Sequence, residues 1–182
     1  MSLRIYGNRQ LKTLPGQETR PTLAVVRQAV FNIWQGRIAD CRWLDLCAGS
    51  GAMGAEALCR GAAIVVGIER SPRACGVIQQ NWQQVAQATQ KFQVMRRDVR
   101  QLKLQGQFDR VYFDPPYASD LYAPVLQAIA DQNLLAAGGE IAVEHNPDCP
   151  ELPAPSGLTV CRQKVYGNTG LTFYCPTAEA AD

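Results

Sequence analysis

The segment Asp45-Leu46-Cys47-Ala48-Gly49-Ser50-Gly51-Ala52-Met53-Gly54 joins an apolar run at residues 42–46 to a stretch with helical spacing. In open α/β sheets, ligands bind beyond the carboxyl ends of the strands. There, glycines let the backbone approach closely and a helix N-terminus offers unpaired N–H groups. The segment therefore predicts a strand–loop–helix unit that holds a nucleoside-containing cofactor. The spacing Gly49-x-Gly51-x-x-Gly54 also fits a dinucleotide fingerprint, so this motif alone does not select the cofactor.

Short apolar runs alternate with helical stretches along most of the chain. The runs are residues 42–46, 64–68, 92–95, 110–113 and 140–143. Such alternation indicates βαβ units and a doubly wound, mostly parallel sheet. After a proline-rich loop, residues 158–165 and 171–175 predict two further strands, and their short connection requires antiparallel pairing. We therefore predict an α/β fold with a seven-stranded, Rossmann-like sheet that ends in an antiparallel hairpin.

Length and charge predict one domain that follows a basic arm. At 182 residues and 47% hydrophobic content, the chain can bury the core of a single domain. Its net charge is +2, but the first 27 residues carry +4 and the remainder −2. We predict a basic arm at residues 1–21, with a solvated terminus as the alternative, and one domain at residues 22–182. The candidate contacts to nucleic-acid phosphates are Arg4, Arg9, Lys12, Arg20 and Arg27.

The cysteines and the single histidine do not predict a metal site. Seven cysteines are present, but no two have the Cys-x-x-Cys spacing of zinc ligands, and His145 is the only histidine. With no secretory leader or membrane-length apolar run, we expect a cytoplasmic protein whose cysteines are mostly small buried apolar residues. We expect His145 to be structural or to line the rim of the site.

Two acids follow the second and third predicted strands. Glu69 ends the second strand, where a carboxylate can accept hydrogen bonds from both hydroxyls of a ribose. Asp98 follows the third strand at the same sheet edge and could accept a hydrogen bond from an adenine amino group. A helix cap or a surface charge is an equal alternative for Asp98.

The sequence Asp114-Pro115-Pro116-Tyr117 ends the fourth predicted strand, which lies beside the first. The lone pair of an exocyclic amine on a nucleobase is delocalised into the ring, so the nitrogen must be reshaped and aimed before it can attack. Asp114 and the Pro115 carbonyl can accept its two hydrogens, and both prolines make the turn rigid. Tyr117 supplies a flat face for an extruded base. The turn predicts transfer of a methyl group to an amino nitrogen.

These motifs resemble the Asp/Asn-Pro-Pro-Tyr amino-methyltransferases, and within them the RsmD-type enzymes that methylate guanine N2 in 16S ribosomal RNA. The Arg20-Pro21-Thr22 opening narrows the match to that family. The similarity covers Arg4-Ile5-Tyr6-Gly7 with Leu14-Pro15, Arg20-Pro21-Thr22 with Val26-Arg27 and Phe31-Asn32, residues 45–54 with Glu56-Ala57-Leu58, Glu69, Asn81, Asp114-Pro115-Pro116-Tyr117, and Glu144.

The resemblance implies a Rossmann-like methyltransferase that uses S-adenosylmethionine and acts on ribosomal RNA, as naked RNA or within the small subunit, without a metal or a membrane. The Asp-Pro-Pro-Tyr turn would hold the guanine. Two alternatives stay open: an amino-methyltransferase for DNA adenine or protein glutamine, and a non-catalytic nucleotide-binding module. The residues expected to bind the cofactor are Asp45, Cys47, Ala48, Gly49, Ser50, Gly51, Glu69, Arg70 and Asp98.

Overall fold

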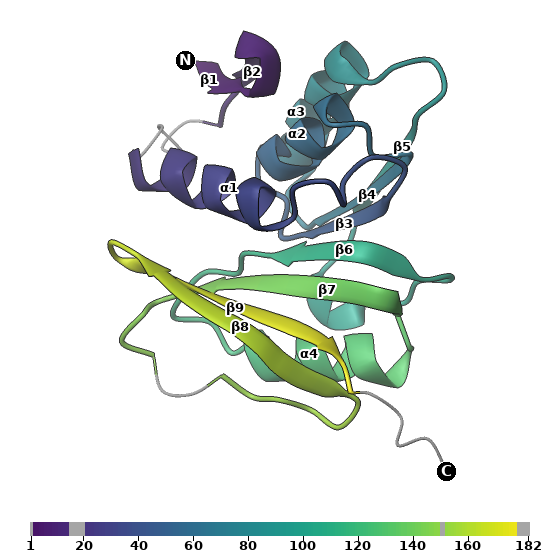
Figure 1. Cartoon of the computed structure of the whole chain (residues 1–182). Helices are drawn as coiled ribbons and strands as arrows, with labels where there is room; N and C mark the ends of the chain where they lie inside the picture. Colours follow the sequence, from purple (N-terminus) through teal and green to yellow (C-terminus); the bar gives the residue numbers. More distant parts are fainter. Residues whose placement is uncertain (1, 15–20, 150–151, 178–182) are drawn as a thin grey trace.

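The computed structural model describes residues 2–14, 21–149 and 152–177 (Figure 1). Its largest feature is one seven-stranded sheet. In sheet order the strands are β5 (Lys91–Arg96), β4 (Ile64–Glu69), β3 (Arg42–Leu46), β6 (Phe108–Phe113), β7 (Leu135–His145), β9 (Thr169–Pro176) and β8 (Leu158–Tyr166). The first five are parallel, whereas β9 pairs antiparallel with both β7 and β8. This confirms the predicted fold class and the C-terminal hairpin.

Helices cover both faces of the sheet. The helices α1 (Pro21–Ile33), α2 (Ala52–Cys59) and α3 (Pro72–Val85) share one hydrophobic core with inward side chains of β3, β4 and β9. The second core lies on the other face, under α4 (Tyr122–Asp131) and the short 3-10 helix η2 (Val99–Gln101). Trp34, Trp43 and Trp82 are fully buried, which confirms that these aromatics belong to the core.

The strand order reverses between β3 and β6, and this reversal locates the site. Leu46 of β3 is in register with Ile68 of β4 and with Phe113 of β6, so the three strands end at the same edge of the sheet. The connection after β3 leads to a helix on one face, whereas that after β6 leads to α4 on the other. The two loops diverge at this switch point, where doubly wound sheets bind their ligands.

The N-terminal residues form a small sheet on the domain. Strands β1 (Ser2–Ile5) and β2 (Arg9–Lys12) pair antiparallel through the one-turn 3-10 helix η1 (Tyr6–Asn8), and the pair lies against α2 and α3 (Figure 1). Ile5 and Leu11 are buried in the core that also holds α1–α3. The first residues are thus attached to the body of the protein by apolar side chains, while their charged side chains face outward.

Two expectations about local structure were wrong. Only Cys41 is buried among the seven cysteines, all of which are free thiols; Cys161 is exposed because it lies on the edge strand β8. Strand β7 begins at Leu135, earlier than the apolar run at 140–143, because a register shift between Phe108 and Arg110 lets the β6 pairing continue past Gly138.

No helix in the described part of the chain is long and apolar enough to cross a membrane.

Candidate functional site

Asp45 fixes the loop between β3 and α2 from its buried side. Its side chain is buried, and one carboxylate oxygen accepts a hydrogen bond of 3.0 Å from the backbone N–H of Gly54, in the first turn of α2. Burial raises the pKa of Asp45 to about 8, and the Gly54 hydrogen bond opposes that rise. Asp45 therefore holds the helix start, while Cys47, Ala48, Gly49 and Ser50 are the partly exposed residues of the loop.

The glycines of this loop have a packing function that the sequence did not predict. A Cβ at Gly54 would lie 2.3 Å from the Trp82 ring, and one at Gly51 would lie 2.8 Å from Trp82 Nε1. The indole N–H donates to the Gly51 carbonyl at 2.7 Å. Gly51 also has a φ of 75°, which L side chains rarely adopt. Trp82 of α3 therefore packs against the buried side of the loop. The partly exposed side remains open to a ligand.

Glu69 joins two of the loops at this edge. Its carboxylate accepts from the backbone N–H of Gly49 at 3.0 Å and from that of Ser71 at 2.8 Å. A carboxylate has about four lone-pair positions, so two remain for the hydroxyls of a ribose. Glu69 therefore lies beside the Gly-rich loop, which is where a carboxylate that binds the ribose is expected.

Asp98 and Arg70 occupy the outer part of the edge. Asp98 caps η2 through the N–H of Arg100, and the Arg100 guanidinium contacts both carboxylate oxygens, the closer at 2.9 Å. These hydrogen bonds from Arg100 lower the pKa of Asp98 to about 2. The geometry matches the cap alternative for Asp98, and an adenine amino group would have to share oxygens that Arg100 already contacts. Arg70 is exposed just after Glu69.

The Asp-Pro-Pro-Tyr turn begins where β6 ends, beside β3. The backbone N–H of Asp114 points to the carbonyl of Leu46, 3.4 Å away, so the turn starts as an extension of the β3–β6 pairing. Burial raises the pKa of Asp114 well above its ordinary value, and the nearby charges of Glu144 and Asp45 add to the rise. Pro115 is buried and Pro116 is exposed, so the turn is fixed on one side and open on the other.

A buried acid that had no assigned role completes this site. Glu144, near the end of β7, accepts hydrogen bonds from the hydroxyls of Tyr112 and Tyr117, the latter at 3.0 Å. The Tyr117 hydroxyl also lies 3.0 Å from the Thr169 hydroxyl of β9. The register of β6 with β7, in which Phe113 pairs with Val143, places Glu144 beside Asp114. Besides the family resemblance, which includes Glu144, strand pairing was the signal that could have placed this acid beside Asp114.

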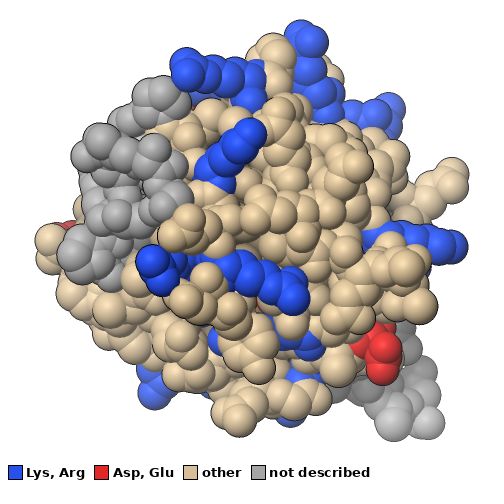
Figure 2. Space-filling model, turned by 90° about the horizontal axis from the view of Figure 1, so that it is seen from above, with Lys and Arg blue, Asp and Glu red and all other residues tan. Residues whose placement is uncertain are grey.

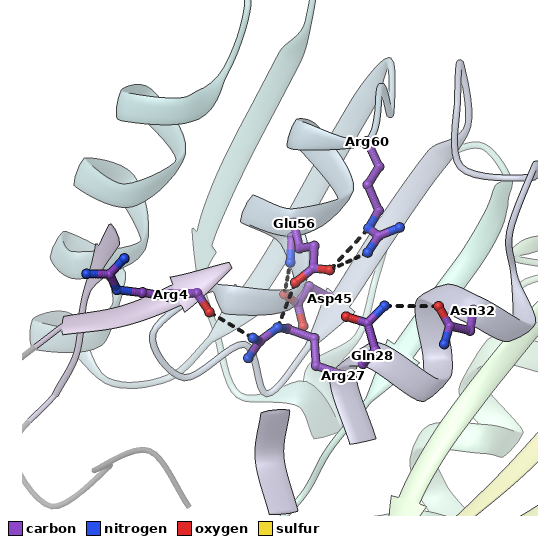
Figure 3. Close-up of polar contacts among 8 residues, drawn as sticks. Arg4, Arg27, Gln28, Asn32, Asp45, Glu56 and Arg60 are labelled. Carbon is purple, nitrogen blue, oxygen red and sulfur yellow. Dashed lines mark hydrogen bonds and ion pairs between the residues drawn. The ribbon is translucent and has the colours of Figure 1, made fainter. Parts of the chain in front are cut away.

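The structure revises the role predicted for Arg27. Its Nε lies 2.6 Å from one carboxylate oxygen of Glu56, and the Arg60 guanidinium lies 2.8 Å from the other (Figure 3). The Arg27 side chain is only 11% exposed. Arg27 also donates to the Arg4 backbone carbonyl at 2.9 Å. Arg27 therefore attaches α1 to α2 and β1, so it is not free to bind a phosphate as predicted. Arg20 lies outside the described residues.

The remaining basic candidates are exposed on the N-terminal sheet. Arg4 and Arg9 project from β1 and β2, and the Lys12 ammonium lies 2.7 Å from the amide oxygen of Gln80 on α3. Seen from above, the face around β1, β2 and α1 carries many more basic than acidic side chains (Figure 2). This face offers a positive surface next to the loops that follow β3.

One groove lies outside the predicted site. This groove of about 580 Å³ runs between α1 and Tyr166 of β8, and none of its lining residues is a predicted site residue.

In residues 2–14, 21–149 and 152–177, no group of three or more His, Cys, Asp or Glu side chains is placed to hold a metal ion. His145 lies 2.9 Å from the Thr172 hydroxyl of β9, where it helps to attach β9 to β7.

Comparison with known proteins identifies the family of this chain. The family model described as "Conserved hypothetical protein 95" matches residues 3–175, which is almost the whole chain. The chain belongs to this RsmD-type family. The Bacillus subtilis protein "Putative rRNA methyltransferase YlbH" is 33% identical over 91% of this chain and 92% of its own length. "Ribosomal RNA small subunit methyltransferase D" of Haemophilus influenzae is 28% identical over 93% of this chain and 90% of its own length.

A solved structure agrees with both the family and the fold. The Escherichia coli structure titled "Putative methyltransferase yhhF" superimposes with a TM-score of 0.83 and 29% identity, over 98% of this chain and 100% of its own. The two chains therefore share one overall fold over nearly their whole lengths.

Proposed function

We propose that this RsmD-type protein transfers a methyl group from S-adenosylmethionine to the exocyclic N2 of a guanine in small-subunit (16S) ribosomal RNA. The observation that carries the proposal is the meeting of two loops at one sheet edge: the Gly-rich loop after β3 and the Asp-Pro-Pro-Tyr turn after β6. The relatives named as small-subunit ribosomal RNA methyltransferases support ribosomal RNA as the substrate class.

The residues of the first loop fit the cofactor. Cys47, Ala48, Gly49 and Ser50 are partly exposed at the start of α2, so their backbone can contact a bound nucleoside. Glu69 keeps lone pairs free for ribose hydroxyls, and the α2 N-terminus attracts the cofactor's carboxylate. When bound there, S-adenosylmethionine supplies an electrophilic methyl group on a positively charged sulfur.

The residues of the second turn fit the amine. Asp114 and the Pro115 carbonyl accept the two hydrogens of the guanine amino group and aim its lone pair at the methyl carbon. Tyr117, 39% exposed, offers a ring face on which the extruded base can stack. As the N–C bond forms and the methyl–sulfur bond breaks, positive charge would develop on the nitrogen, and the carboxyl oxygens beside it would stabilise that charge as hydrogen-bond acceptors. The methylated amine then loses its proton readily, so no strong base is required.

The direct test is to incubate the purified chain with small-subunit ribosomal RNA, and separately with assembled subunits, in the presence of methyl-labelled S-adenosylmethionine. We expect N2-methylguanosine in the nucleoside digest, and far less of it with the Asp114→Ala variant in the same time. In parallel incubations with DNA and with protein, methylated adenine or methylated glutamine would move the enzyme to the second class of substrate. Cofactor binding without methylation of any of these would favour a non-catalytic module.

We further propose that the basic residues of the arm position the RNA through its phosphates. Arg4, Arg9 and Lys12 are exposed on β1 and β2, whereas acids lie at the site itself. Each phosphate contact that is lost should lower the slope of log affinity against log salt by about one unit or slightly less. Arg4→Ala should therefore lower the slope without changing cofactor affinity, and an unchanged slope would assign RNA binding to another surface.

A further inference from the structure

Tyr117, in the loop after β6, is held at its hydroxyl end by residues from two strands. Its phenol oxygen lies 3.0 Å from Glu144 Oε1 of β7 and 3.0 Å from Thr169 Oγ1 of β9. A phenol has one proton, so when that proton is donated to the carboxylate the Thr169 hydroxyl donates to the phenol oxygen. The ring, which is part of a loop, is thereby fixed at the end farthest from its backbone.

The carboxylate that holds Tyr117 is itself enclosed. Glu144 is 2% exposed, and its second oxygen, Oε2, accepts the hydroxyl proton of Tyr112, a fully enclosed side chain of β6. A buried carboxylate is costly unless each oxygen is hydrogen-bonded, and here each oxygen receives one phenol. The two phenols bind different oxygens, so Oε1 holds Tyr117 without needing the Tyr112 bond to Oε2.

We propose that Glu144 is a positioning residue for methyl transfer, which orients the Tyr117 ring as the stacking face for the extruded base. This inference rests on the proposed function, because Tyr117 matters only if a base enters the site. Glu144 touches Tyr117 and not the base, so it acts through the ring. Stacking needs a face held at a fixed angle, and a hydrogen bond between loop and sheet provides that rigidity.

Tyr112 offers a matched control. Its phenol donates to the same carboxylate, but it lies in the core and does not reach the mouth of the site. Tyr112→Phe removes one hydrogen bond to Glu144 and leaves the Tyr117 contact, whereas Tyr117→Phe removes the contact but keeps the ring. If only the stability of the buried carboxylate mattered, the two substitutions would have similar effects on methylation.

The kinetic test compares Tyr117→Phe, Glu144→Leu, the two combined, Glu144→Gln and Tyr112→Phe. Tyr117→Phe and Glu144→Leu should each lower kcat/KM for RNA by about ten- to hundredfold, the range expected for loss of a hydrogen bond to a charged group. The combined variant should be no worse than the poorer single one. Glu144→Gln, which can still accept from Tyr117, should recover activity to within several-fold of the parent, and Tyr112→Phe should have little effect. S-adenosylmethionine affinity should not change.

Effects of Tyr117→Phe and Glu144→Leu that multiply would overturn the inference, as would equal losses from Tyr112→Phe and Tyr117→Phe. If Glu144→Leu does not fold because it strands the Tyr112 hydroxyl, the Tyr112→Phe/Glu144→Leu pair removes that hydroxyl as well. A second readout needs no substrate: the NMR signal of ring-labelled Tyr117 should shift on Glu144→Leu and stay near its parent position on Tyr112→Phe. Failure of the unchanged chain to methylate RNA would count against the proposed function, and an unmoved Tyr117 signal would count against the positioning role.

Discussion

Asn81 should be worth about 3 kcal/mol of stability, because its side chain connects the N-terminal sheet to the Gly-rich loop. The amide is fully buried and makes three hydrogen bonds. Its oxygen accepts from the N–H of Lys12 at 2.9 Å, and its nitrogen donates to the carbonyls of Lys12 at 3.0 Å and Ser50 at 2.9 Å. Each such bond contributes roughly 1 kcal/mol net, and removing one side leaves its partner unsatisfied. Asn81→Ala should therefore lower the Tm by about 6–12 °C.

The preceding residue provides the control. Gln80 has the same amide chemistry and contacts the same residue, but it is exposed and accepts only from the Lys12 ammonium, at 2.7 Å. Gln80→Ala should change the free energy of unfolding by less than about 0.5 kcal/mol. Asn81→Asp keeps the acceptor for the Lys12 N–H but turns a carboxylate toward two carbonyls, so it should be as damaging as alanine.

Thermal and chemical unfolding measure the stability loss, and calorimetry with S-adenosylmethionine measures the effect on the loop. Because Asn81 holds the Ser50 carbonyl, Asn81→Ala should also weaken cofactor binding, and Gln80→Ala should not. If Asn81→Ala unfolds at the same temperature as Gln80→Ala, the connection between arm and loop has no energetic weight and the reasoning fails.

Three further predictions concern the sheet edge. Asp114→Ala should slow single-turnover methylation by about 100- to 1000-fold while cofactor affinity stays within a small factor; near-normal turnover would contradict its role. Burial raises the pKa of Asp45 to about 8, so the folded state retains a proton that the unfolded chain releases near pH 4, and stability should fall as the pH rises from about 4 to about 8. Denaturant unfolding of Asp45→Asn across that window should show a shallower fall, and an unchanged slope would mean that other groups control it. Gly54→Ala, whose Cβ would lie 2.3 Å from Trp82, should cost roughly 1–3 kcal/mol or more by overpacking, and an unchanged Tm would show that Trp82 can move aside.

The sequence was sufficient for the parts of this fold that depend on local pattern. Alternating apolar runs predict the parallel sheet, and a short turn at residues 167–170 requires the antiparallel hairpin. The meeting of the Gly-rich loop with the Asp-Pro-Pro-Tyr turn follows from the same pattern, because motifs at the ends of neighbouring parallel strands share an edge.

The contacts that the sequence did not predict join residues far apart in the chain. Asn81 reaches back to Lys12, and Glu144 reaches back to Tyr112, through a packing that no local period encodes. The charge count grouped Arg27 with the phosphate contacts. A count of charges cannot show that Arg27 is already paired, here with the buried carboxylate of Glu56. The paired strands β1 and β2 were also missed, since two strands of four residues each give little pattern.

The electrostatics of the sheet edge favour a cationic methyl donor over a dinucleotide, a choice that the glycine spacing left open. Asp45, Asp114 and Glu144 follow one another across β3, β6 and β7, and burial raises the pKa of all three. A nearby anionic pyrophosphate would raise these pKa values further, and the low dielectric would strengthen that effect. A bound sulfonium would instead favour the ionised forms of these acids and so would lower their pKa values. Once ionised, the same acids would thus favour both binding of the proposed methyl donor and the proposed transfer.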